Sequence, residues 1–403
     1  MAASVPAFEP YTEAFAADPY PVYAALRETT PVFRSEALGM VLVTRYRDVR
    51  RLLTDRRFGR TSVPRADGRP PPGPLPGELP HWDRWVRVNL LETEGETHAR
   101  LRRLLGGALA PARIQALAGS IEAIATALVQ RLEPGSEVDF VSEIAEPLPV
   151  SVIAELFGWP PDEIGTLRPW AADIVRLYEK DATAEDRRRA DEAARAFGER
   201  LIALIEERRR RPRDDLVSAL AARLDAADGL SMDELVANSI LVLNAGHEAT
   251  VNAAGNGLLA LLRHPDARRA LLAAPARVPQ AIEEMLRYDS PLHLFHRFAG
   301  EDLEIGGVSV ARGEAVGLLY GAANRDPEAF PEPDRFDIGR HPNRHLAFGA
   351  ATHFCLGAPL ARLELRTLFG ALLGRLGAME LGEAPEYRTG LVFRGLQRLV
   401  VRP

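Results

Sequence analysis

Lysine and cysteine are almost absent from the chain. Its 403 residues include a single cysteine, Cys355, and a single lysine, Lys180. A Schiff base or a lysine-containing phosphate loop would depend on Lys180, and its setting, LYEKDA, fits neither. One cysteine excludes an internal disulfide and any zinc or iron–sulfur site built from several cysteines. Cys355 is therefore an inert buried residue, a nucleophile or one ligand of a larger group.

The chain also lacks a strong charge imbalance and a long apolar run, and we expect no leader sequence. It carries 50 Lys+Arg against 56 Asp+Glu, a net charge of −6, and 46% of its residues are hydrophobic. This composition is typical of a globular protein and argues against a dedicated nucleic-acid binder. Its first residues contain no basic segment followed by an apolar run, so we expect no signal peptide and a cytoplasmic protein. No apolar run approaches the roughly 20 residues of a membrane helix, so we expect no membrane association.

Periodicity predicts a mainly α chain with a small β portion, folded as a single domain over residues 1–403. The predicted helices cover residues 47–55, 96–131 with a break near Pro111, 147–157, 232–264, 277–289 and a last helix from about Pro359. The predicted strands cover residues 39–46, 303–310 and 314–321. Residues 61–80, rich in proline and glycine, are predicted to be a loop; loops of this length are usually lids, binding segments or disordered.

One predicted helix is unusually long and contains a lone acid. Ser231 and Glu234 fit a capping box and Pro265 follows the helix, so about 33 residues would span roughly 50 Å. Glu248 is the only formal charge between residues 235 and 262. A lone acid in an apolar helix is costly unless it is paired or hydrated, which favours a functional role. The alternative is a structural carboxylate with a buried arginine or histidine partner.

The residues around Cys355 predict a tight loop that leads into a helix. Gly357 permits close approach of the backbone to the sulfur, and Pro359 suits the first turn of a helix. Amides and the dipole at a helix N-terminus favour a thiolate, which is a good soft metal ligand. A nucleophilic cysteine would instead need a base, for which His353 or His345 could serve. An inert buried cysteine is the third interpretation.

This loop resembles the haem-binding loop of the cytochrome P-450 family. The family pattern fits at Phe348, Gly349, His353, Cys355 and Gly357, and the following Leu-Ala-Arg also fits. The pattern departs at its second glycine, which is an alanine at position 351. The resemblance implies a haem b cofactor with Cys355 as the axial ligand of the iron. It also implies the cytochrome P-450 fold, with the haem between the long central helix and the cysteine loop.

A second motif extends the resemblance toward the middle of the chain. Glu284 and Arg287 match the family's Glu-x-x-Arg, and at this spacing they share a helix face and can pair. In the family a third partner comes from the segment before the cysteine, and Arg335 matches it. The resemblance gives these three residues a structural role beneath the haem.

Groups for the haem carboxylates can be matched as well. His98 and Arg102 fit the family's His-x-x-x-Arg, Arg297 follows the Glu-x-x-Arg helix, and His353 stands two residues before the cysteine. Guanidinium forks suit propionates, and histidine adds a donor. Each residue taken singly could instead form an ordinary ion pair.

The middle of the long helix resembles the family's oxygen-activating motif. Ala245 belongs to a stripe of small residues that would let the haem approach closely, and Gly246 loosens the helix and can leave room for O2 and water. The resemblance implies that Glu248 helps to deliver the protons that split the O–O bond. The family usually has threonine next, where this chain has Ala249. Thr250 lies about 100° further round the helix and cannot simply replace it.

The resemblance places a substrate pocket between the long helix and several loops. Its candidate residues are Trp85, Val88, Leu90, Leu241, Asn244, Ala245, His293, Phe295, Val392 and Phe393. Asn244 and His293 are polar where apolar residues would be expected, so they could orient a polar substrate. Alternatively, the backbone satisfies these polar groups.

The resemblance implies a soluble, bacterial-type haem-thiolate monooxygenase of secondary metabolism that uses O2 to hydroxylate, dealkylate or epoxidise a small organic or natural-product substrate. Electrons would come from NAD(P)H indirectly, through a ferredoxin and its reductase, and we expect a monomer. The expected docking face carries four arginines, namely Arg102, Arg103, Arg344 and Arg362. Ala249 motivates an alternative on the same haem, oxidative coupling of phenols or peroxide-driven oxidation. A remote alternative is a non-catalytic helical binding protein.

Overall fold

The computed structural model describes residues 8–63, 77–224 and 226–403, and helices make up most of it. The α-helices are α1 (Glu13–Ala17), α2 (Tyr20–Thr29), α3 (Tyr46–Thr54), α4 (Pro80–Trp85), α5 (Gly95–Ala108), α6 (Pro111–Ala116), α7 (Ala118–Gln130), α8 (Pro147–Phe157), α9 (Ile164–Arg176), α10 (Ala184–Arg210), α11 (Leu216–Ala221), α12 (Met232–Arg263), α13 (Pro265–Ala273), α14 (Val278–Tyr288), α15 (Tyr320–Ala323) and α16 (Ala358–Leu376). Shorter helical turns are η1 (Val141–Ala145), η2 (Pro161–Glu163), η3 (Pro275–Arg277) and η4 (Ala351–His353).

The strands form one sheet of five and three smaller ones. They are β1 (Val32–Ser35), β2 (Met40–Val43), β3 (Phe58–Gly59), β4 (Val138–Asp139), β5 (Leu294–Ala299), β6 (Leu303–Ile305), β7 (Val308–Val310), β8 (Ala315–Leu319), β9 (Glu380–Leu381), β10 (Glu386–Tyr387), β11 (Leu396–Arg398) and β12 (Val400–Arg402). The largest sheet has the order β1-β2-β8-β5-β3, in which β2 and β8 are parallel and the other neighbours antiparallel. The pairs β6–β7 and β10–β11 and the three-stranded sheet β4-β12-β9 complete the β portion.

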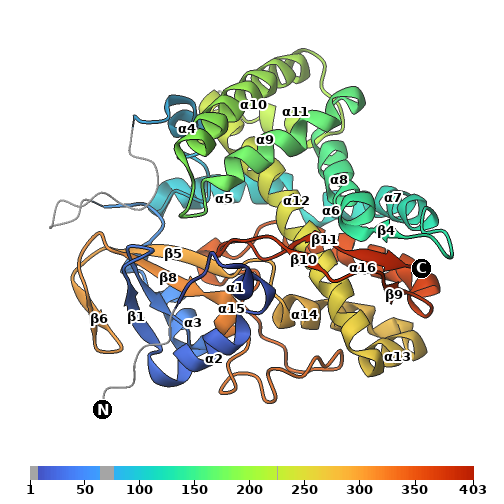
Figure 1. The fold of residues 1–403 in the computed structure, drawn as a ribbon. Helices are drawn as coiled ribbons and strands as arrows, with labels where there is room; N and C mark the ends of the chain where they lie inside the picture. Colours follow the sequence, from blue (N-terminus) through green and yellow to red (C-terminus); the bar gives the residue numbers. More distant parts are fainter. Residues whose placement is uncertain (1–7, 64–76, 225) are drawn as a thin grey trace.

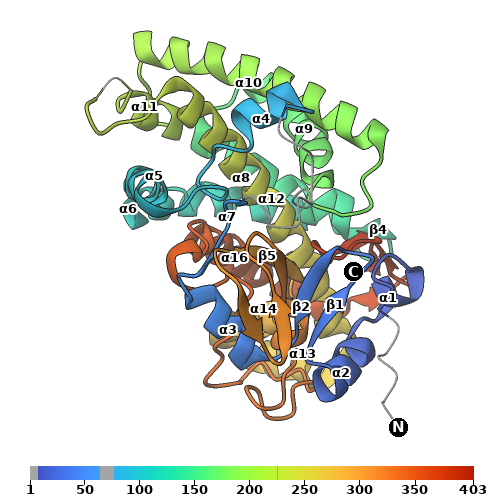
Figure 2. The ribbon, with the colours of Figure 1, turned by 90° about the vertical axis from the view of Figure 1, so that its left-hand side faces the viewer.

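Side chains alternate between the two faces of this sheet, as the pleat requires. Val41 and Val43 of β2 join the cluster that contains α3, whereas Met40 and Leu42 join the cluster that contains Tyr23 and Leu26 of α2. The sheet therefore buries both faces. It lies to one side of the molecule, opposite the layer of α9, α10 and α11 (Figures 1 and 2).

The long helix α12 passes through the whole molecule between these two parts (Figure 1). Ser231 caps it by accepting a hydrogen bond from the Glu234 amide, and the Glu234 side chain accepts one from the Ser231 amide in return. It packs against α8 and α10 on one side and against α14 and α16 on the other. Because neighbours surround it, most of its residues are buried even though many are polar, as the sequence predicts.

The structure confirms the mainly α prediction with a small β portion, and most predicted elements lie close to the observed ones. The strand predicted over residues 303–310 is instead a hairpin of β6 and β7, because Gly306 and Gly307 turn the chain with positive φ angles. The helix predicted over residues 96–131 is three helices, α5 to α7, divided at Pro111 and again at Leu117. The predicted loop 61–80 lies largely outside the described residues.

In the part of the chain that the structure describes, no single helix is long and apolar enough to cross a membrane. One bent pair among the described helices meets that requirement by length and composition. It consists of the run of α5 and α6 followed by α7, with a bend of 60° between the two parts.

Candidate active site

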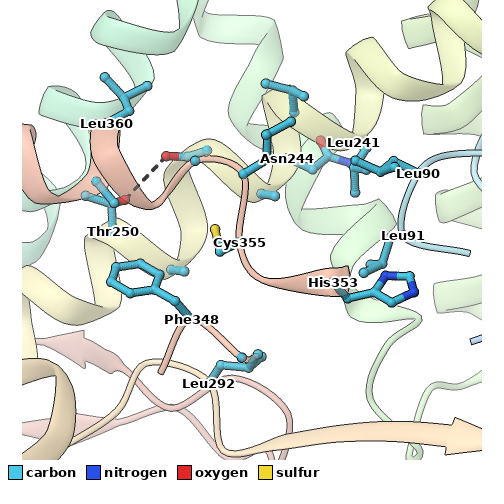
Figure 3. A pocket seen from close by; sticks show the side chains of 18 of the residues that line it. Leu90, Leu91, Leu241, Asn244, Thr250, Leu292, Phe348, His353, Cys355 and Leu360 are labelled. Atoms are coloured by element: carbon cyan, nitrogen blue, oxygen red, sulfur yellow. Dashed lines mark hydrogen bonds between the residues drawn. The ribbon is translucent and has the colours of Figure 1, made fainter. Parts of the chain in front are cut away.

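A cavity of about 300 Å³ separates α12 from the loop that carries Cys355. α12 lines one side of it, and residues 347–357 with the start of α16 line the opposite side. Helices α5, α8 and α9, strand β5 and the turn near residue 392 close the rest. Figure 3 shows Cys355 at its centre, between Phe348 and the residues of α12. Elements far apart in the sequence thus converge on the one cysteine.

The cysteine loop is held by its own backbone so that the sulfur faces the cavity. The Cys355 amide donates to the Phe348 carbonyl over 2.9 Å, and Gly349 turns the chain with a φ of +68°. The sulfur is exposed to the cavity although it lies below the molecular surface. This burial raises the pKa of the Cys355 thiol, and the amides of Gly357 and Ala358 at the start of α16 oppose the rise. The amides act as the sequence predicts, but burial outweighs them.

The alanine that departs from the family pattern occupies a strained position. Ala351 has a φ of +59°, in the left-handed region that disfavours any residue with a Cβ. A glycine would adopt this conformation without cost, so the departure at position 351 leaves the loop path unchanged but stores roughly 1 to 2 kcal/mol of strain.

Glu284 and Arg287 form a fully buried ion pair beneath the cysteine loop. The Arg287 Nε and Nη2 atoms donate to the two carboxylate oxygens of Glu284, each over 2.8 Å, and both side chains are 0% exposed. Arg287 also donates through Nη1 to the carbonyls of Asn324 and Pro333. The pair therefore joins α14 to the segment that leads to the cysteine.

The prediction that Arg335 is the third partner is wrong for its side chain. Arg335 points outward and pairs with Glu332, and only its backbone carbonyl meets Arg287. The third cation is Arg340, whose Nε lies 3.2 Å from both oxygens of Glu284. The chain turns between these two positions, so the residue five places later faces inward. The sequence contains no signal that selects one of several arginines in a loop of this kind.

The side chains predicted to bind haem carboxylates gather at one end of the cavity. His98, Arg102, Arg297 and His353 all line it. The rings of His98 and His353 lie 4.3 Å apart, and Arg102 donates to the Phe354 carbonyl over 2.8 Å. The structure thus brings the four predicted residues together.

The charge state of this cluster fits an anionic cofactor group. Arg297 is 3% exposed and has no carboxylate partner in the described ranges. Its guanidinium makes one hydrogen bond there, to the His296 carbonyl. Burial lowers the pKa of His98 to about 4, so its ring is neutral, and its Nε2 has no partner among the described residues. His353 differs from the prediction in one respect, since Glu94 already accepts from its Nε2 over 3.0 Å. A buried arginine without a counter-ion and a free ring nitrogen are what haem propionates would satisfy, so the residues present fit the haem.

Small residues form the face of α12 that lies opposite the cysteine. Ala245, Gly246, Ala249 and Thr250 all line the cavity. Gly246 also lets α8 approach, because a Cβ there would lie 2.8 Å from Ile153. The predicted room for O2 and water is thus partly taken by this helix contact. The Thr250 hydroxyl lies 3.4 Å from the Gly246 carbonyl, the contact drawn as a dashed line in Figure 3.

Glu248 is paired with an arginine, as in the structural alternative, but that arginine is partly exposed and not buried. Its Oε1 accepts from Arg388 Nη1 over 2.6 Å, and the side chain does not line the cavity. Arg388 also lies 3.4 Å from Glu146, which Arg168 holds at 2.6 Å. Burial raises the pKa of Glu146 despite these two arginines. Arg388 is 35% exposed and Arg168 58%, so this ion-pair network connects Glu248 with solvent.

The structure adds a buried acid that the sequence did not indicate. Glu364 is 1% exposed and lies on α16, the helix that packs against α12. Burial raises the pKa of its carboxyl well above the ordinary value, and its Oε2 has no partner in the described part of the chain. Helix α16, which starts three residues after Cys355, thus buries a carboxyl group whose charged form is disfavoured. A glutamate in an amphipathic helix gives no hint of this, because only its facing helix decides its burial.

Seven of the ten candidate pocket residues line the cavity, and three do not. Leu90, Leu241, Asn244, Phe295, Val392 and Phe393 line it together with Ala245. Trp85 packs instead against α10, where a Cβ on Gly198 would lie 2.4 Å from its ring. Val88 is 38% exposed on the surface. His293 faces the core, where its Nδ1 lies 3.1 Å from the Tyr23 hydroxyl, and so cannot orient a substrate.

Comparison with known proteins agrees with this geometry. A profile of the family described as Cytochrome P450 matches residues 172–275 and 276–380. The chain is 40% identical to cytochrome P450 107B1 of Saccharopolyspora erythraea, with 99% of this chain and 98% of the relative covered. It is 38% identical to 6-deoxyerythronolide B hydroxylase of the same organism, with 97% of each covered. A crystal structure of P450BioI bound to an acyl carrier protein carrying hexadec-9Z-enoic acid superposes with a TM-score of 0.89 at 34% identity, covering 97% of this chain and all of the other.

These matches extend over nearly the whole length of the chain and of each relative, and the similar structures share the observed arrangement of helices and small sheets. A relative named as a hydroxylase favours oxygen insertion over the coupling, peroxide-driven and binding-protein alternatives. The chain belongs to the cytochrome P450 family and is a monooxygenase of that family.

Proposed function

We propose that the chain, acting as one domain in the cytoplasm, oxygenates a mainly apolar natural product with O2 and with electrons from a separate ferredoxin and its reductase. The observation that carries this proposal is Cys355, whose sulfur faces a cavity opposite the small residues of α12. The cavity walls beyond the propionate cluster are almost entirely aliphatic and aromatic side chains, which suit an apolar substrate.

In this proposal Cys355 would hold the haem iron, and Arg297, Arg102 and His98 would hold the propionates. When bound, haem supplies the redox chemistry that activates O2. The Phe348 carbonyl and the amides of Gly357 and Ala358 fix the position of the cysteine and its sulfur. Because the loop is already ordered, the position of the Cys355 sulfur does not have to be established during turnover.

Glu248 would move protons between solvent and the cavity. Its carboxylate is held by Arg388 at 2.6 Å, so it must leave this partner before it reaches the cavity. Arg388 keeps a second acid, Glu146, as an alternative partner when Glu248 turns inward. Since Ala249 has no hydroxyl, the water that receives the proton would be held by Thr250, by the Gly246 carbonyl or by the substrate.

The redox partner would dock on the face that carries Phe354, next to the cysteine. Phe354 is 39% exposed, and Arg103, also expected on this face, has a side chain that is 59% exposed. An apolar residue and an exposed cation on one face suit an acidic protein such as a ferredoxin. Arg103 pairs with Asp228, and Arg362 is held by Glu283 over 2.7 Å, so an acidic partner would compete with these two carboxylates.

Turnover under ¹⁸O2 tests the proposal. Purified haem-loaded protein is supplied with a ferredoxin, its reductase, NADPH and a substrate found by a type I spectral shift. The proposal predicts one ¹⁸O atom in the product and none when reductase is omitted. A product that gains no oxygen from O2, or that forms equally well with hydrogen peroxide alone, would contradict it.

A further inference from the structure

Asn244 is a polar side chain of the cavity whose acceptor oxygen has no hydrogen-bond partner among the described residues. Asn244 lies on α12 three residues after Leu241, so the two share one helix face. Figure 3 shows it beside Leu241 and Leu90, both of which line the cavity. The asparagine is thus surrounded by apolar side chains at the wall of the cavity.

The Asn244 carboxamide is buried and has an unused acceptor. The residue is 6% exposed, and its Oδ1 has no hydrogen-bond partner in residues 8–63, 77–224 and 226–403. A buried polar atom without a partner is disfavoured in a folded protein and is rare. Because the residue lines the cavity, a rotation of the carboxamide would present this oxygen to a ligand that completes it.

A second asparagine on the same helix shows what a structural role looks like. Asn238 is 0% exposed, and both ends of its amide are satisfied. Its Oδ1 accepts from the Leu90 amide over 2.8 Å, and its Nδ2 donates to the Glu234 carbonyl over 2.7 Å. Asn238 therefore fixes the Leu90 loop to α12. Asn244, six residues further along the helix, makes no comparable hydrogen bond in the described residues.

Several other polar side chains line the cavity. Asn89 accepts from the amides of Leu91 and Glu92, and Thr250 bonds to the Gly246 carbonyl. The hydroxyls of Tyr178 and Tyr320 also face this wall and could donate or accept, whereas Asn244 offers a buried carbonyl-type acceptor without a partner in the described residues.

From this contrast we infer that Asn244 Oδ1 accepts a hydrogen bond from a hydroxyl or amine of an otherwise apolar substrate. The inference rests on the proposed monooxygenase function and names the substrate class as an apolar skeleton with a donor at one end. Ala249 lies five residues further along α12, or roughly 7.5 Å along its axis. The same hydroxyl would therefore be too distant to replace the hydroxyl that Ala249 lacks.

Matched triplets of small molecules test this inference. Each triplet contains a steroid, sesquiterpenoid or macrolactone alcohol, its deoxy analogue and its methyl ether. Dissociation constants are measured by Soret titration and by calorimetry on the haem-loaded wild type. We expect at least one alcohol to bind roughly tenfold more tightly than both of its analogues, since one buried hydrogen bond separates them.

Asn244→Leu should remove this preference, and Leu241→Met, which changes shape on the same helix face without a polar atom, should keep it. Ethers that bind as tightly as alcohols, alcohols that all fail to bind, or a preference that survives in Asn244→Leu would each overturn the inference. Every variant is first checked for the absorption band of its reduced CO complex. Loss of that band in the wild type would refute the proposed function instead, so the two failures can be told apart.

Thermal unfolding without substrate gives an independent readout. Asn244→Leu should leave the midpoint unchanged or raise it, because no protein partner is lost. Asn238→Leu is the matched control and should lower the midpoint, since it orphans the Leu90 amide. A decrease for Asn244→Leu as large as that for Asn238→Leu would mean that Asn244 is structural, and would contradict the inference.

Discussion

Replacement of Arg340 by methionine should destabilise the segment that carries the cysteine, whereas the same change at Arg335 should not. Methionine keeps most of the apolar length of arginine, so the comparison isolates the guanidinium. The side chain of Arg340 is 9% exposed and that of Arg335 is 62% exposed. Sequence resemblance selects Arg335 as the partner of Glu284, but the structure selects Arg340.

The magnitude follows from the contacts that each change removes. Arg340 donates to Glu284 and to the carbonyls of Pro331, Glu332 and Arg335. Breaking a buried ion pair costs about 3 to 5 kcal/mol. Glu284 keeps Arg287 as a bidentate partner and accepts two further hydrogen bonds, so we expect about 2 to 3 kcal/mol for Arg340→Met.

Arg335→Met removes an exposed pair with Glu332 and leaves the Arg335 carbonyl in place, so the expected loss is about 0 to 1 kcal/mol. Urea unfolding of the haem-loaded proteins, followed by tryptophan fluorescence and by the Soret band, measures both. Equal destabilisation by the two variants, or a larger effect at Arg335, would refute the assignment of Arg340.

Three further predictions concern the same region and the proton path. Glu248→Gln keeps the contact with Arg388 but cannot carry a proton. Product formed per NADPH should therefore fall by about 10²-fold and more hydrogen peroxide should form, while the spectrum of the CO complex is unchanged. An unaltered ratio of product to NADPH would argue against proton delivery by Glu248. Ala351→Gly relieves a φ of +59° and should stabilise the protein by about 0.5 to 1 kcal/mol in urea unfolding, and a loss of stability would show that the alanine is unstrained. Burial raises the pKa of Glu283, but hydrogen bonds from Arg362 and His345 outweigh it and lower the pKa from 4.5 to about 2. The resulting stability, roughly 2 kcal/mol after screening, is present above pH 4.5 and is lost as the pH falls toward 2, so Glu283→Gln should flatten the pH dependence of unfolding in that window.

Local signals predicted the elements and the cysteine loop well. The capping box at Ser231 and the proline after Arg263 bound α12, because caps act through neighbours in the chain. The Glu284–Arg287 pair is equally local, since three residues of helix bring the two side chains together. Features of this kind need no knowledge of tertiary structure.

Contacts between distant segments could not be predicted in the same way. Arg388 lies 140 residues after Glu248, and no periodicity connects the segment after β10 with a helix. His293 and Val88 fall in segments that approach the cavity, but the direction of each side chain depends on how the segment is turned. Glu364 is polar on a surface-like pattern and becomes buried because other helices pack against α16.

The central claim is that Cys355 is the thiolate ligand of a haem iron that faces α12. The absorption spectrum of the dithionite-reduced protein with CO tests it most directly. The account predicts a Soret maximum at about 450 nm for the wild type, the signature of a cysteine-thiolate ligand, and its loss in Cys355→Ala. A wild-type protein that binds haem but shows no such band, or a band that survives in Cys355→Ala, would contradict the account.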